Sequence, residues 1–176
     1  ANGARSHMAA SLDYLPASAR SDPAFFIGNM VPTCIDDDRA AAAAVMRRTL
    51  ASYVRLPNYQ NYWIEAGYED EMLAIRAALA KGEIQHVPEL MSDRWLRDVT
   101  LFGSVREVRE GVEAWMATGV RTLIVVASST RGGQMVKMLA PLARGTLGAA
   151  EGFQQLMEPG QLRDPVVQGR SADDPV

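Results

Sequence analysis

The fold of this chain is decided by the stretch RTLIVVASSTRGGQMVKML, which occupies residues 121–139. It begins with Leu123, Ile124, Val125 and Val126, a continuous apolar run rich in β-branched side chains. Such a run is typical of a strand with both faces buried, most often in a parallel sheet that helices cover. A turn that contains glycine follows, and then apolar residues recur at helical spacing. We therefore predict a buried strand, a loop and a helix over this stretch.

A second strand and a helix precede this stretch. Residues 99–102 form a short apolar run that ends at Gly103. Ser104 and Glu107 then fit the capping box, in which the two side chains satisfy each other's backbone donors at the start of a helix. Residues 99–126 thus predict a strand–helix–strand unit, in which the strands are parallel and the crossover is right-handed.

An earlier extended segment is predicted at residues 25–35, with interruptions at Gly28 and Pro32. Because proline has no N–H to donate, we expect the strand to be irregular or bulged at Pro32. The aspartates at residues 36–38 open a helix, and a further helix is predicted at residues 70–81. With about three strands, the chain has too few to bury the apolar run, so we expect the sheet to be incomplete within it.

The same three aspartates would suit a metal ion, but no histidine or second carboxylate cluster stands near them. We interpret them as N-caps of the helix and expect no metal site. Cys34 is the only cysteine, which excludes an intrachain disulfide and a cysteine-based metal site. A nucleophilic role for Cys34 is the alternative to the more usual one, a small buried apolar side chain.

Composition and charge exclude several classes of partner. The net charge of −3 and the pI of about 5.4 give no preference for a polyanion, so we expect no nucleic-acid partner. No apolar run is long enough to cross a bilayer, and the first residues lack the apolar centre of a signal peptide. We therefore expect a cytoplasmic protein with no membrane partner.

We expect three parts along the chain. Residues 1–8, ANGARSHM, are interpreted as a cloning scar and set aside from the functional argument. Residues 9–144 are predicted to form one α/β domain. In residues 145–176 proline and glycine recur and periodicity is weak, which predicts a flexible tail.

Three segments together resemble the C-terminal part of the bacterial luciferase-like monooxygenases. They are CIDDDRAAAAAVMRRTLASYV at residues 34–54, LPNYQNYWIEAGYEDEM at residues 56–72 and DVTLFGSVREVREGVEAWMATGVRTLIVV at residues 98–126. The likeness is greatest to the deazaflavin-dependent branch and covers roughly residues 20–142. It implies an α/β fold that is a partial (β/α)8 barrel, with about the last three strand–helix units and extra helices. The first five units would be missing.

The resemblance also implies a function. Members of the family bind flavin mononucleotide (FMN) or coenzyme F-420 at the C-terminal mouth of the barrel, where hydride transfer or oxygen activation takes place on the cofactor. We therefore expect the C-terminal portion of a flavin- or F-420-dependent oxidoreductase or monooxygenase that acts on a small-molecule substrate. The portion would not be active alone, and we expect a homo-oligomer or a complementing N-terminal half. The alternatives are a non-catalytic half-barrel that assembles with a second copy and a fragment that folds differently from its parent.

Candidate cofactor-binding residues follow the strand at residues 123–126. In barrels, the loop after the last strand lies at the active mouth and often contacts phosphate. Hydroxyls, an arginine and the free N–H groups of a helix start would suit such an anion. We predict that Ser128, Ser129, Arg131 and Gly132 bind the cofactor. The alternative is an ordinary capped turn with a solvated arginine.

Candidate substrate-binding residues are Asn58, Tyr59 and Asn61, in a polar and aromatic segment after Pro57. Amide groups and aromatic edges can line a pocket over a planar cofactor. The alternative is a packed turn between helices or a protein–protein contact. No catalytic residue is predicted, because hydride transfer from a reduced cofactor can proceed without one and the missing half could supply one.

Overall fold

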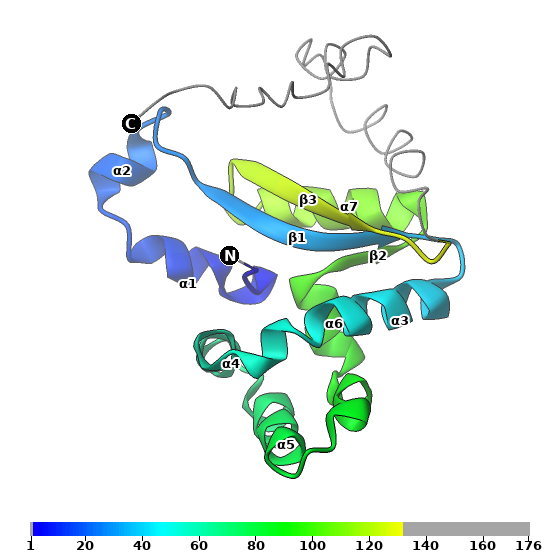
Figure 1. Ribbon diagram of the computed structural model, residues 1–176. Coiled ribbons are helices and arrows are strands. Elements are labelled where there is room, and N and C mark those ends of the chain that lie inside the picture. Colours follow the sequence, from blue (N-terminus) through cyan, green and yellow to red (C-terminus); the bar gives the residue numbers. More distant parts are fainter. Residues whose placement is uncertain (1, 132–176) are drawn as a thin grey trace, which may run out of the picture. The chain divides into compact units, whose positions relative to one another are not determined.

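Residues 2–131 are described by the computed structural model, and they form a small parallel sheet with helices around it (Figure 1). In chain order the elements are η1 (Arg5–His7), α1 (Met8–Asp13), α2 (Ala17–Ser21), β1 (Gly28–Ile35), α3 (Arg39–Leu50), η2 (Tyr53–Arg55), α4 (Pro57–Glu65), α5 (Glu69–Ala80), η3 (Ile84–Leu90), α6 (Asp93–Val99), β2 (Leu101–Gly103), α7 (Val105–Met116) and β3 (Thr122–Ser128), where η marks a 3-10 helix. The helix expected after β3 and the tail expected at residues 145–176 lie outside the described residues.

The strand β1 lies between the other two described strands, in the order β2-β1-β3, and both pairings are parallel. β3 pairs with β1 along its whole length, whereas β2 pairs with β1 only from Thr33 onward. The predicted α/β class with parallel strands is therefore confirmed. In a barrel, however, each strand pairs with the next one along the chain. Because β2 and β3 are not neighbours, the expectation of three successive barrel strands is wrong in its strand order.

The strand β1 is continuous over eight residues, so the interruption predicted at Pro32 is wrong. Pro32 lies opposite Val126 of β3, and the pairing of β1 with β2 begins one residue later, at Thr33. At Pro32, β1 thus has a described neighbour on one side only. A strand tolerates proline where the ladder on one side is open, which explains why the strand continues.

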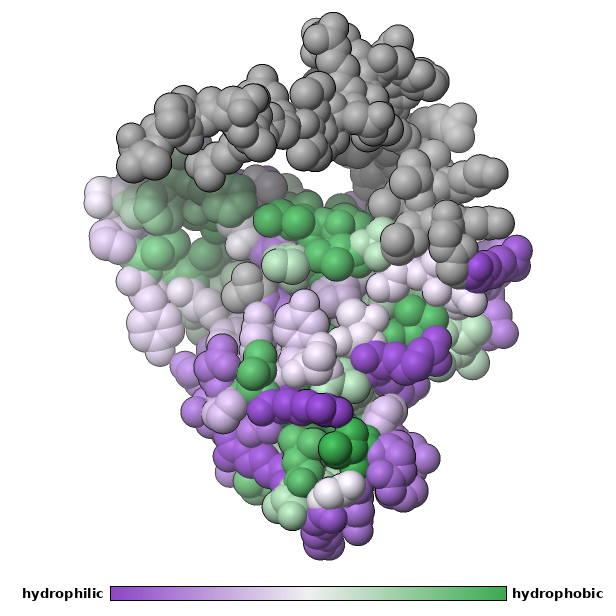
Figure 2. Space-filling view, in the orientation of Figure 1, coloured by the Kyte–Doolittle hydropathy of each residue, from purple (hydrophilic) through white to green (hydrophobic). Residues whose placement is uncertain are grey.

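The strand β3 forms an edge of the sheet within the described residues and is only partly buried. Its apolar sequence predicts burial on both faces, and this prediction is wrong for the described part of the chain. Ile124 leaves 46% of its surface exposed. Figure 2 shows hydrophobic surface in the part of the view where β3 lies in Figure 1. The sequence of β3 therefore suits a covered position, but the described residues leave it half covered.

Two separate clusters of buried side chains lie on the two faces of the sheet. Because successive side chains of a strand point to opposite faces, Cys34 enters the first cluster, and Val31 enters the second. The first cluster lies among α3 to α6 and contains Trp63 and Trp95, whose rings meet edge to face at 4.9 Å. Trp115 of α7 belongs to the second. Burial of these large side chains supplies the main stabilisation of both layers.

The first residues of the chain are part of the folded core. Ala4 is completely buried in the first cluster, and the backbone N–H of Gly3 donates to Asn29 Oδ1 of β1 at 3.1 Å. The backbone N–H of Ser6 donates to Asp98 Oδ1 at 3.0 Å, and its hydroxyl donates to Asp98 Oδ2 at 2.6 Å. The described residues of this segment, which the sequence analysis interprets as a cloning scar, therefore pack on β1 and α6.

The carboxylate of Asp98 joins this N-terminal segment to the helix α5. Tyr68, the residue that precedes α5, donates its hydroxyl to Asp98 Oδ2 at 2.8 Å. Burial and this hydrogen bond to the carboxylate raise the pKa of Tyr68 to about 12, so its hydroxyl keeps the proton that it donates. Asp98 is itself almost completely buried and depends on these donors to offset its desolvation.

The substitution Tyr68→Phe tests this junction. It removes one donor from a buried carboxylate, and we expect the free energy of unfolding to fall by about 1–3 kcal/mol. Urea denaturation followed by circular dichroism measures the change. Tyr14→Phe is the matched control, because Tyr14 is 79% exposed and its loss should cost less than about 0.5 kcal/mol. Equal effects of the two substitutions would contradict the role given to Asp98.

Candidate functional site at the carboxyl edge of the sheet

The three described strands are parallel, so their carboxyl ends lie at one edge of the sheet. β1 ends at Ile35, β2 at Gly103 and β3 at Ser128, and register places Ile35 opposite Gly103 and Cys34 opposite Ser128. The backbone N–H of Asp36 donates to the carbonyl oxygen of Gly103 at 2.9 Å. In parallel α/β sheets, ligands bind outside the carboxyl ends of the strands. The loops that meet here therefore form the candidate site.

The carboxylate of Asp36 connects the loops after β1 and β3. Its Oδ2 accepts a hydrogen bond from the hydroxyl of Thr130, and its Oδ1 accepts one from the backbone N–H of Asp38 at 2.9 Å. The hydrogen bond from Thr130 lowers the pKa of Asp36 most, followed by the bond from Asp38, and the positive charge of Arg131 adds to both. The edge therefore carries an ionised carboxylate beside a hydroxyl and a guanidinium group.

Two of the three aspartates after β1 have different roles. Asp38 is the N-cap of α3, and its Oδ1 accepts from the backbone N–H of Ala41 at 3.0 Å, so the capping interpretation is confirmed for this residue. Asp36 does not cap the helix and belongs to the candidate site instead. The sequence did not predict the contact between Asp36 and Thr130. The one signal for Asp36 was its place directly after a strand.

The structure places three of the four predicted cofactor-binding residues at this edge. Ser128 ends β3, and Ser129 Oγ accepts from the backbone N–H of Arg131 at 3.1 Å. The side chain of Arg131 is exposed, while both serines are half-buried. Gly132 lies outside the described residues. The loop therefore presents hydroxyl, backbone and guanidinium donors next to one another.

Cys34 lies in the carboxyl half of β1 and is completely buried. Its pKa is raised, first by burial and then by the negative charge of Asp36. The thiol therefore keeps its proton at neutral pH, which makes it a poor nucleophile. This agrees with the interpretation of Cys34 as a small buried apolar side chain and argues against the nucleophilic alternative.

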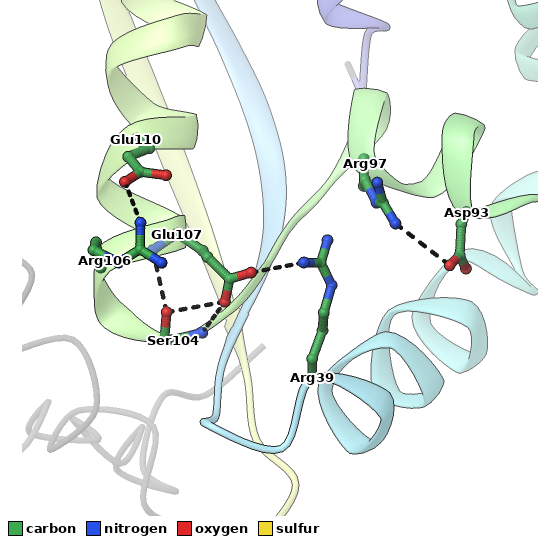
Figure 3. Close-up of polar contacts among 7 residues, drawn as sticks. All are labelled: Arg39, Asp93, Arg97, Ser104, Arg106, Glu107 and Glu110. Atoms are coloured by element: carbon green, nitrogen blue, oxygen red, sulfur yellow. Dashed lines mark hydrogen bonds and ion pairs between the residues drawn. The ribbon is translucent and has the colours of Figure 1, made fainter.

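The helix α7 begins with the predicted capping box, which is confirmed (Figure 3). Glu107 Oε2 accepts from the backbone N–H of Ser104 at 2.9 Å, and the backbone N–H of Glu107 donates to Ser104 Oγ at 3.3 Å. Gly103 before it has φ +119°, and a Cβ there would lie 2.4 Å from Glu107 Oε2. This capping accounts for Ser104 without a ligand.

The predicted substrate-binding residues lie on the helix α4, which Figure 1 shows away from the carboxyl end of β3. Asn58 is exposed, and Asn61 Oδ1 accepts from Arg76 Nη2 at 2.6 Å. The ring of Tyr59 packs between those of Tyr53 and Trp63, at centroid distances of 5.3 and 5.4 Å. The structure thus does not bring these residues to the candidate site, and it gives Tyr59 a packing role.

Fold and site together define an α/β protein whose functional groups gather at the carboxyl edge of a parallel sheet. The model of the luciferase-like monooxygenase family matches residues 3–122, and the chain belongs to this family. The match begins at residue 3, so the segment first set aside as a cloning scar lies almost entirely inside the family's domain.

A relative in Mycobacterium tuberculosis (strain ATCC 25618 / H37Rv), Rv3520c, is described by its name as a coenzyme F-420-dependent oxidoreductase. It is 27% identical over 133 residues, which are 72% of this chain and 38% of the relative. The chain thus spans less than two fifths of the length of that protein. No solved structure matches the chain significantly. Within residues 2–131, no helix combines the length and apolar character that a membrane span needs.

The substitution Thr130→Val tests the electrostatics of the edge. It removes the main cause of the low pKa of Asp36, and we expect that pKa to rise toward its ordinary value. NMR titration of the Asp36 carboxyl carbon measures the change. Because the pKa is lowered on folding, Asp36 stabilises the fold above its unfolded pKa, and this stabilisation is lost as pH falls through the folded pKa.

In the Thr130→Val variant, the free energy of unfolding should therefore fall less on acidification than in the unchanged chain. Thr122→Val is the control, since Thr122 is exposed at the other end of β3. An unchanged titration of Asp36 in the Thr130 variant would contradict the hydrogen bond.

Proposed function

We propose that this chain is the C-terminal portion of a flavin- or F-420-dependent oxidoreductase or monooxygenase. Membership of the luciferase-like monooxygenase family and the likeness to the mycobacterial relative support this class of reaction. The observation that carries the proposal is the group of donors and the ionised carboxylate at the carboxyl edge of the sheet. FMN or coenzyme F-420 would bind there with a small-molecule substrate.

The residues at the edge fit a cofactor that carries phosphate. Ser128, Ser129 and the guanidinium of Arg131 offer hydrogen-bond donors that suit a phosphate group. Asp36 would not contact the phosphate. It would hold Thr130 and Arg131 in place through the hydrogen bond and the charge attraction described above. When bound, the cofactor supplies the hydride transfer or oxygen activation, while these residues bind and orient it.

The strand pairing supports a specific place for this chain in a barrel. β1 and β3 pair along seven residues, from Gly28 to Cys34 on β1, which suits consecutive barrel strands. β2 pairs over only three residues and would then belong to an insertion between them, at residues 36–121. The rest of the barrel would cover the free edge of β3 and the half-covered Ile124. On this basis the chain needs a complementing N-terminal half, or a second copy, for activity.

A non-catalytic half-barrel is the second candidate. Within residues 2–131, β3 is an edge strand and Ile124 is exposed, which favours this candidate because an unpaired apolar edge strand tends to pair with another chain. The concrete form is a two-fold dimer of this chain. Analytical ultracentrifugation separates the candidates, since a strictly monomeric folded chain would contradict assembly through the edge.

A fluorescence titration with FMN, and separately with coenzyme F-420, tests the enzyme proposal. We expect saturable binding of one of them to the chain, alone or mixed with the N-terminal part of the mycobacterial relative. Arg131→Ala should weaken it about tenfold or more, because a charged hydrogen bond contributes about 1.5–3 kcal/mol.

Lys81→Ala is the matched control for the same loss of charge, at the far end of α5 and away from the carboxyl edge. If neither cofactor binds under either condition, the proposal fails.

A further inference from the structure

A hollow of about 320 Å³ lies beside β2, away from the carboxyl-edge loop of β3. Its walls include three arginines from three different elements: Arg5 of η1, Arg39 of α3 and Arg97 of α6. Figure 3 shows Arg39 directed to Glu107 and Arg97 directed to Asp93. Leu101 and Phe102 of β2 also line the hollow, although their side chains belong to the cores on opposite faces of the sheet. Sequence analysis gave no sign of this site, because its arginines are far apart in the chain.

Two of these arginines have unfilled donors. Arg5 Nε lies 3.9 Å from Asp98 Oδ1, and Arg97 Nη2 lies 3.6 Å from Asp93 Oδ2. Both distances are too long for a hydrogen bond. Among the described residues, neither guanidinium group donates a hydrogen bond to another partner. Each therefore has N–H groups available to a ligand.

Their acidic neighbours are already occupied. The oxygens of Asp98 accept from Ser6 and Tyr68, as described above. Asp93 Oδ1 pairs with Arg47 Nη2. The charge of Asp93 is thus shared between Arg47 and Arg97, and the lone pairs of Asp98 are taken up by Ser6 and Tyr68, so neither carboxylate forms a close hydrogen bond with Arg97 or Arg5.

The third arginine is held in position. Arg39 Nη1 donates to Glu107 Oε1 at 2.7 Å, and its guanidinium carbon lies 5.5 Å from the centre of the Phe102 ring. The capping box keeps Glu107 ionised, because the backbone N–H and the hydroxyl of Ser104 lower its pKa. Arg39 is therefore fixed by an ion pair and a ring contact before any ligand arrives. Such preorganisation reduces the entropy that a ligand must offset on binding.

Charge and shape together point to a phosphate-bearing ligand. Of the two glutamates that line the hollow, Glu107 is paired with Arg39, and Glu110 with Arg106, which does not line it. The guanidinium group binds phosphate with two parallel hydrogen bonds, which a single charged amine cannot do. The volume suits a small molecule, for which the wall of Leu101 and Phe102 provides apolar contact.

We propose that this hollow is an anion site that binds a small organic phosphate through Arg5, Arg97 and Arg39. The phosphate group would bridge Arg5 and Arg97, and the organic part would lie against β2. Ser128 and Arg131, the predicted cofactor residues, do not line the hollow. The proposal therefore does not depend on the proposed function.

Isothermal titration calorimetry on the full chain tests this site, at constant ionic strength. The probes are inorganic phosphate, pyrophosphate and glycerol 3-phosphate, with chloride as the reference anion. We expect saturable binding with one molecule per chain, tighter for glycerol 3-phosphate than for inorganic phosphate because of the apolar wall. Tighter binding of pyrophosphate than of glycerol 3-phosphate would contradict the proposal of an organic ligand and would indicate a site for inorganic polyanions.

Variants locate the binding. Arg5→Gln and Arg97→Gln should each raise the Kd at least about tenfold. Arg97→Lys should have the same effect, because lysine keeps the positive charge but cannot form the two parallel hydrogen bonds of a guanidinium group. Arg55→Gln is the matched control, since Arg55 is exposed and does not line the hollow. Because the side chains of Arg5 and Arg97 make only long ion pairs within the described residues, these substitutions should leave the circular dichroism spectrum unchanged.

Failure to bind any of the phosphates would overturn the proposal. So would an equal loss of binding in the Arg55 variant, or full retention in Arg97→Lys. The first would mean that the arginines are only solvated. The other two would mean that binding follows net charge and not a built site.

Discussion

The pairing of β1 with a parallel strand on each side is the constraint on which the rest of the structure depends. It fixes the direction of all three described strands, and so brings Asp36 and the loop after β3 to one edge. The alternation of side chains along β1 then separates two apolar layers, with Val31 on one face and Cys34 on the other. The first residues of the chain attach to the same strand through Asn29. Helices, N-terminal segment and site therefore all take their positions from one strand.

Local signals predicted much of this fold correctly. The α/β class, the capping box of Ser104 and Glu107, and the strand at residues 123–126 each follow from residues close in the sequence. Strand order could not be predicted in that way, because pairing joins residues far apart in the chain. The ladder between β1 and β2 is only three residues long, so the sequence holds little information that could have corrected the expectation of consecutive strands. The interruption predicted at Pro32 is wrong for the same reason. Whether a strand tolerates a proline depends on where the neighbouring strand begins.

The candidate site shows the same division. Ser128, Ser129 and Arg131 were predicted from one observation, that they follow a strand. Thr130 and Asp36 were missed because they are 94 residues apart and meet only through the sheet. The burial of the N-terminal residues and the hollow lined by arginines are likewise non-local. Sequence patterns thus predicted the loop of the candidate site, whereas the partner groups that set its charge required the structure.

The three tryptophans place an intrinsic fluorophore on each face of the sheet. Trp63 and Trp95 form an edge-to-face pair in one layer, whereas Trp115 is alone in the other, and all three are completely buried. Their indole N–H groups have no hydrogen-bond partner within the described residues, so each ring lies in an apolar environment. Close contact in the pair favours energy transfer between the two indoles, which the isolated ring lacks. The intrinsic emission of this chain therefore reports on both layers at once, without any added label.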